Sequence, residues 1–160
     1  MGKTSILPTL NGHVSEIRYL LLPAGSQPPK VEELPFRVAV IVRSPVSDAW
    51  RNLVSRWLVD NGCLYMSAWG DECSKWDDSV DNANLDDFAF GDIPDDRFVY
   101  TTWHENESLT EALFFSLYCA RHPAVELKST LLIDISDVGH ETDVLKLCNE
   151  LALEYGPLED

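Results

Sequence analysis

The stretch Arg37-Val-Ala-Val-Ile-Val-Arg43 is a short, continuous run of apolar residues, most of them β-branched. Such a run is typical of a strand that is buried on both faces of a parallel sheet, because a half-exposed strand alternates polar and apolar residues. The residues that follow, Ser44-Pro-Val-Ser47, turn the chain toward a helix with Ser47 or Asp48 as its N-cap. The pattern predicts a βα unit.

Further helices are indicated by apolar periodicity and by capping residues. The first helix has Trp50, Val54 and Leu58 on one apolar stripe and ends at Gly62. A second helix is predicted from Ser108, where Glu111 three residues later completes a capping box. A last helix follows and ends before residues 156–157, which are Gly-Pro.

Strands alternate with these helices. Residues 63–69, 98–103 and 129–135 predict three strands in addition to residues 37–43. Alternation of this kind implies right-handed βαβ units. The sequence therefore predicts a three-layer α/β fold of the Rossmann or flavodoxin type, with helices on both faces of a small, mostly parallel sheet of four to five strands.

Residues 1–35 are expected to form an N-terminal extension to a single α/β domain of residues 36–160. Ile17 to Leu22 can form a strand, and prolines at positions 8, 23, 28, 29 and 35 flank it. Because proline cannot donate to a sheet ladder, this strand is expected at an edge of the sheet, followed by an extended linker.

The chain is strongly acidic, and its charge is unevenly distributed. It has 160 residues, 45% of them hydrophobic, and a net charge of −15, which suits one folded domain with a proper core. Residues 71–107 hold twelve carboxylates and two basic residues, so −10 of the −15 lies there. Such a surface repels nucleic acid and anionic lipid and attracts a basic protein patch.

The cysteines and the motifs that are absent from the sequence indicate where the protein is located and which activities it lacks. The four cysteines are widely spaced, without a C-x-x-C pair, and no signal peptide or membrane-length apolar run is seen, so a cytoplasmic protein with reduced thiols is expected. The turn after residues 37–43 lacks the glycines of a phosphate-binding loop, and no Gly-x-Ser-x-Gly elbow occurs. No cofactor and no metal site are expected, and the oligomeric state stays open.

A site is expected at the carboxyl ends of the strands, where open parallel sheets bind ligands and partners. Two of these ends carry tryptophan followed by charged or nucleophilic residues, in residues 69–73 and 103–105. The connection between them is about 28 residues long, more than a plain loop, and a short helix starting near Asp77 can account for part of it.

The motifs of this region resemble those of a known family. The runs Trp69-Gly70, Cys73-Ser74, Trp76-Asp-Asp-Ser-Val-Asp81 and Thr101-Thr-Trp-His-Glu105 resemble an uncharacterised bacterial family that is classed as a domain of unknown function. The resemblance covers roughly residues 36–135. It implies a bacterial origin and a shared structural unit, and it brings no activity.

One enzymatic hypothesis combines Cys73 with His104. An imidazole beside a thiol produces a thiolate nucleophile, and Asp78 or Glu105 could orient the ring. The surrounding negative charge opposes this activation, because it raises the pKa of a thiol. Asp77, Ser79 and Asp81 also mimic the start of a calcium loop, which lacks the turn glycine and the last glutamate.

The leading hypothesis is a small acidic interaction protein that binds a basic surface of another protein, as an inhibitor, immunity or anti-defence protein does. Tryptophan anchors and carboxylates supply affinity and steering. A small Cys/His enzyme and a metabolite-binding regulatory domain are the alternatives. The residues expected to bind the partner are Trp69, Asp71, Glu72, Trp76, Asp77, Asp81, Trp103 and Glu105.

Overall fold

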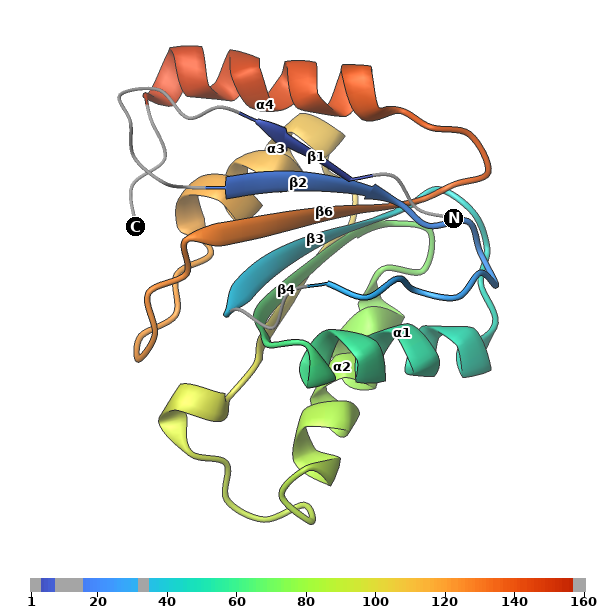
Figure 1. The fold of residues 1–160 in the computed structure, drawn as a ribbon, viewed down its shortest axis with the longest axis vertical. Coiled ribbons are helices and arrows are strands. Elements are labelled where there is room, and N and C mark those ends of the chain that lie inside the picture. Colours follow the sequence, from blue (N-terminus) through green and yellow to red (C-terminus); the bar gives the residue numbers. More distant parts are fainter. Residues whose placement is uncertain (1–3, 8–15, 32–34, 157–160) are drawn as a thin grey trace.

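The computed structural model describes residues 4–7, 16–31 and 35–156, and it contains one twisted sheet between two layers of helices (Figure 1). The strands lie in the order β1-β2-β6-β3-β4-β5. Their bounds are β1 Thr4–Leu7, β2 Glu16–Leu21, β3 Phe36–Val42, β4 Cys63–Gly70, β5 Tyr100–His104 and β6 Ser129–Ile135. Strands β2 to β6 run parallel to one another, and β1 is antiparallel to β2.

Strand β3 lies in the middle of the parallel part of the sheet. All seven of its residues are buried, as its continuous apolar run predicted. Val38, Val40 and Val42 pack on one face, and Ala39 and Ile41 pack on the other. The predicted three-layer α/β fold with a mostly parallel sheet is confirmed.

Four helices cover the two faces of the sheet. Figure 1 shows α1 and α2 on one face and α3 and α4 on the other. Their bounds are α1 Asp48–Asp60, α2 Ser74–Asp86, α3 Leu109–Phe114 and α4 Glu141–Tyr155, and a π-helical turn, Phe115–Cys119, extends α3. Ser47 caps α1, and Ser108 with Glu111 forms the expected capping box at the start of α3.

Strand β2 is not an edge strand, in contrast to the expectation from the surrounding prolines. It pairs with β6 on one side and with β1 on the other, so residues 16–21 belong to the sheet of the α/β domain. Pro8 lies outside the described residues, and the other four prolines, at positions 23, 28, 29 and 35, lie in the segment after β2, which crosses to the α1 face of the sheet. There the indole N–H of Trp50 donates to the Ser26 carbonyl and that of Trp57 to the Pro29 carbonyl. Much of the rest of the expected extension lies outside the described residues.

The long connection between β4 and β5 contains a helix, as its length suggested. Helix α2 begins four residues after Gly70 and packs against α1 and β5. It is followed by a 3₁₀ turn, Asp95–Arg97, before β5. Among the described residues, no helix combines the length and the apolar character that a membrane span requires.

Candidate functional site

Strands β4 and β5 bring two parts of the expected site to the same rim. They are neighbours and run parallel, with Ala68 opposite Trp103 and Trp69 opposite His104. The assumption that their carboxyl ends meet is therefore confirmed. What each side chain does at this rim depends on which face of the sheet it occupies.

Cys73 lies on the α1/α2 face and is almost fully buried. Its side chain packs in the core that includes Trp76, and the backbone of His104 lies close to its sulfur. Burial is the main cause that raises the pKa of the Cys73 thiol above its ordinary value, and Glu105 raises it further. A buried thiol with a raised pKa is a poor nucleophile at neutral pH.

The imidazole of His104 points to the opposite face of the sheet. Its ring lies 4.7 Å from the ring of Phe115, and its two nitrogens are occupied by Glu107 Oε2 at 2.6 Å and Thr102 Oγ1 at 3.1 Å. The structure thus brings the backbone of His104 to Cys73 but not its ring. The expected thiol–imidazole pair is not formed, because the His104 side chain projects from β5 to the face opposite the one on which Cys73 is buried. Asp78 is exposed on α2.

Three side chains join α2 to the edge strand β5. The hydroxyl of Thr101 bonds to Asp77 Oδ1 and lies 3.0 Å from Asp81 Oδ1. Burial raises the pKa of Asp81 to about 6, the Thr101 hydrogen bond lowers it, and the nearby carboxylates of Asp77 and Asp78 raise it. Two half-buried carboxyl groups therefore share one hydroxyl. A cation from outside the chain would stabilise the charged form of these groups.

The tryptophans of the rim have different environments. Trp103 is 46% exposed on β5, on the same face as Thr101. Trp69 is half-buried on the other face, where its indole N–H donates to the Glu107 carbonyl at 2.8 Å. Trp76 is fully buried, so the expectation that it binds a partner is wrong. It lies on the core side of α2, because its helical neighbours in the core are Val80 and Cys73.

The remaining expected partner-binding residues are exposed. Asp71 and Glu72 lie at the turn into α2, where Glu72 pairs with Lys75 at 3.0 Å and lies 3.8 Å from Arg51. Glu105 follows β5 and is exposed. We name the residues that gather at β5 and the outer side of α2 the acidic edge. Its members are Asp77, Asp78, Asp81, Trp103 and Glu105.

A second polar cluster at the carboxyl ends was not predicted. Asp134 of β6 has a side chain with no exposed surface, and it contacts Tyr19, Arg43 and His140. The sequence signal was an aspartate inside the otherwise apolar strand 129–135, since a buried carboxylate needs partners. The strand order brings these partners together, and the sequence alone does not give that order.

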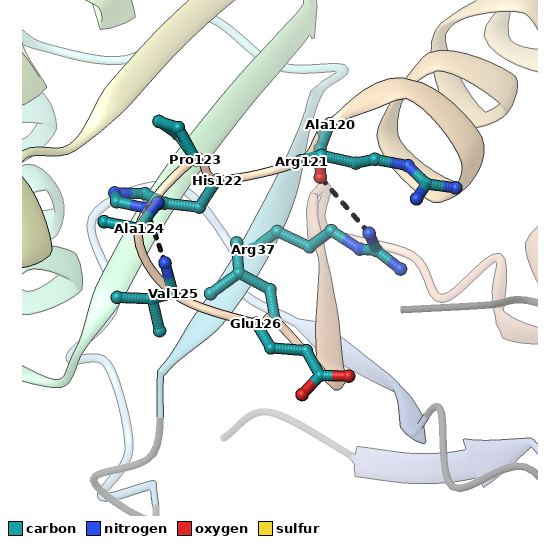
Figure 2. A pocket seen from close by; sticks show the side chains of 9 residues that line it. Arg37, Ala120, Arg121, His122, Pro123, Ala124, Val125 and Glu126 are labelled. Atoms are coloured by element: carbon teal, nitrogen blue, oxygen red, sulfur yellow. Dashed lines mark hydrogen bonds between the residues drawn. The ribbon is translucent and has the colours of Figure 1, made fainter.

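The opposite end of the sheet contains a cavity of about 320 Å³, shown in Figure 2. It lies between the start of β3 and residues 120–127. Arg37 donates to the Ala120 carbonyl and to Thr130 Oγ1 there. His122 accepts from the backbone N–H groups of Ala124 and Val125 and donates to the Phe98 carbonyl. These bonds hold the turn before β6 and give its polar groups a structural role.

In the described ranges, no group of three histidine, cysteine or acidic residues is arranged to hold a metal ion. A family model described as Domain of unknown function (DUF7684) matches residues 17–151. This confirms the resemblance that the motifs around Trp69 and Trp103 suggested. Comparisons with curated proteins and with solved structures found no match.

Proposed function

The chain belongs to the family described as Domain of unknown function (DUF7684), and we propose that it is a small acidic interaction protein. Its acidic edge binds a basic surface of a partner protein. A bacterial inhibitor, immunity protein or anti-defence protein uses a surface of this kind. The proposal places recognition on the outer side of β5 and α2.

The observation that carries this proposal is the exposure of Trp103. A tryptophan that is 46% exposed on the last strand of a sheet leaves much of a large apolar ring in water. Tryptophan is among the residues that contribute most to binding when a partner covers them, and its ring also attracts lysine and arginine. The carboxylates beside it add the charge that a basic partner would neutralise.

The charges around Trp103 support a basic partner over a neutral one. Asp77 and Asp81 lie beside Thr101 on the same face as Trp103, and Asp78 and Glu105 are exposed. Burial, and after it the nearby carboxylates of Asp77 and Asp78, raise the pKa of Asp81, and a lysine or arginine close by would stabilise its charged form. Attraction of this type speeds association and selects partners by charge.

The proposal is tested with two charge-reversed variants of equal net charge. The first, Asp78→Lys/Glu105→Lys, reverses the charge at two exposed positions of the acidic edge. A separate variant, Trp103→Ala, removes the exposed tryptophan ring. Glu150→Lys/Glu154→Lys makes the same change in net charge on exposed positions of α4, on the other side of the molecule. Partners are captured from a lysate of the native host, quantified by mass spectrometry and then titrated in pure form.

We expect both acidic-edge variants to weaken binding of the captured basic protein at least tenfold, whereas the α4 variant binds almost as the wild type does. An equal loss in both charge-reversed variants would mean that only total charge matters. Unchanged binding in the acidic-edge variants would contradict the proposal. Circular dichroism checks that each variant is folded.

A further inference from the structure

Asp134 is held by three hydrogen-bond donors from three different elements. Arg43 Nε lies 2.9 Å from Oδ1, while the Tyr19 hydroxyl and His140 Nδ1, at 3.2 Å, share Oδ2. The Tyr19 hydroxyl also accepts from the backbone N–H of His140 at 3.0 Å. Burial raises the pKa of Tyr19, followed by its hydrogen bond with Asp134, so this tyrosine stays protonated and keeps donating.

The position of this cluster in the sheet favours a ligand site. Strands β3 and β6 are neighbours, but β3 continues into α1 on one face and β6 continues into α4 on the other. At such a divergence the connecting chains separate, and open α/β sheets bind ligands there. Arg43 directly follows β3, and His140 directly precedes α4.

The contacts also determine which ring nitrogen of neutral His140 carries the proton. An ionised carboxylate can only accept, so Nδ1 must carry the proton and Nε2 must carry the lone pair. In the described part of the chain Nε2 has no hydrogen-bond partner, and the side chain is 31% exposed. This differs from His104, whose two ring nitrogens both have partners.

A cavity of about 280 Å³ opens beside His140. Tyr19 and Leu21 of β2 line one side, and residues 139–143 line the other. Among the residues that the structure describes, no side chain caps the start of α4, so backbone N–H groups of its first turn can donate to a bound oxygen. Glu141 and Asp143 also line the cavity, which disfavours an anionic ligand.

We propose that His140 is a general base that hydrolyses a small neutral or cationic carboxylic ester bound in this cavity, and that Asp134 positions its ring. Nε2 takes a proton from water while the water oxygen forms a bond to the acyl carbon. The bond from that carbon to the alcohol oxygen then breaks, and the alcohol leaves with the proton that Nε2 returns. The products are the acid and the alcohol.

The first test measures hydrolysis of p-nitrophenyl acetate by the full chain. We expect His140→Ala to lower the rate at least tenfold, and His104→Ala, the matched control with its own carboxylate partner, to stay within about twofold. p-Nitrophenyl phosphate should not be hydrolysed, because Glu141 and Asp143 repel it. Equal rates for wild type and His140→Ala, or equal losses in both histidine variants, would overturn the proposal.

The second test reads the positioning role of Asp134 directly. Nitrogen-15 NMR of the wild type should show neutral His140 with its proton on Nδ1, and Asp134→Asn should shift the proton toward Nε2 and lower the ester rate. A wild-type proton on Nε2 would overturn the positioning role even if Asp134→Asn fails to fold.

Discussion

Three polar side chains, Cys73, Asp134 and Asp81, are fully or partly buried, and each is accommodated differently. Cys73 stays a neutral thiol because burial raises its pKa. Asp134 is surrounded by three hydrogen-bond donors, which is how a buried carboxylate is tolerated. Asp81 has only a hydroxyl and other carboxyl groups near it, so burial raises its pKa to about 6.

The raised pKa of Asp81 predicts that Asp81→Asn stabilises the protein at neutral pH. Between its ordinary value of 3.8 and about 6, the folded state holds a proton that the unfolded state has lost. Stability therefore falls as pH rises through this window and stays low above it. Because the carboxyl is half-exposed, we expect a gain of about 1 kcal/mol at pH 7, measured by urea unfolding.

The control for this prediction is Asp78→Asn, which removes the same charge from an exposed position of the same helix. Because Asp78→Asn keeps Asp81, its unfolding free energy should fall between pH 4 and pH 6 as that of the wild type does, whereas that of Asp81→Asn should change little. If Asp81→Asn shows the same pH dependence as the wild type, the Asp81 carboxyl does not titrate in this window.

The buried thiol of Cys73 predicts slow alkylation. Iodoacetamide at pH 7.5 should label the exposed Cys119 first, and Cys73 should react only when the protein opens. Mass spectrometry of peptides over time measures both rates in one sample. Rapid labelling of Cys73 in the folded protein would support the hypothesis from the sequence that its thiol is a nucleophile.

The sequence predicted that the ends of β4 and β5 share a rim, but not which face of the sheet each residue occupies. The motifs at Trp69 and Trp103 correctly indicated two adjacent strand ends. His104 is the last residue of β5, and a shift of one residue in that strand would reverse its face. Trp76 is expected to bind a partner because it lies among carboxylates in the sequence, whereas helix α2 turns it into the core.

At the scale of elements, Gly70 couples β4 to β3. Its φ is +104°, and a Cβ there would lie 2.1 Å from the carbonyl oxygen of Val42. That same oxygen accepts from the backbone N–H of Asp71 at 2.8 Å. The chain leaves β4 so close to the end of β3 that only glycine fits, and this approach directs the turn into α2.

We expect Gly70→Ala to destabilise the fold by about 3 kcal/mol or more, because both the backbone conformation and the contact with backbone are unfavourable. Gly25→Ala is the matched control. Gly25 also has a positive φ, +84°, but nothing lies within 4 Å of its Cβ position, so about 1 kcal/mol is expected. Equal losses in thermal or urea unfolding would show that the contact with Val42 contributes nothing.

The sequence predicted the helices and strands that neighbouring residues specify. It did not predict the features that depend on how strands pair across the sheet. The capping box at Ser108 and the apolar run of β3 both specify their elements from neighbouring residues. The place of β2 between β1 and β6, and the meeting of Asp134 with Arg43, depend on strand order. Strand order is set by contacts between distant residues, which one sequence does not display.

At the scale of the whole molecule, the negative charge lowers the stability of the folded state but promotes binding of the proposed basic partner. The net charge is −15, and much of it lies between residues 71 and 107 on one part of the molecule. Repulsion among these groups destabilises the compact state and is screened when salt is added. The same screening weakens attraction to a basic partner.

Salt is therefore expected to act with opposite sign on stability and on binding. Raising NaCl from about 0.01 M to about 0.5 M should raise Tm by a few degrees, roughly 1 kcal/mol for a chain of this size. It should also lower affinity for the captured partner.

In Asp92→Asn/Asp95→Asn/Asp96→Asn, which removes three exposed charges, Tm at low salt should be higher and its salt dependence smaller. Calorimetry measures Tm, and titration measures affinity in the same buffers. A Tm independent of salt in both proteins would mean that the carboxylates are too well solvated to repel one another, and steering by the acidic edge would then lose its physical basis.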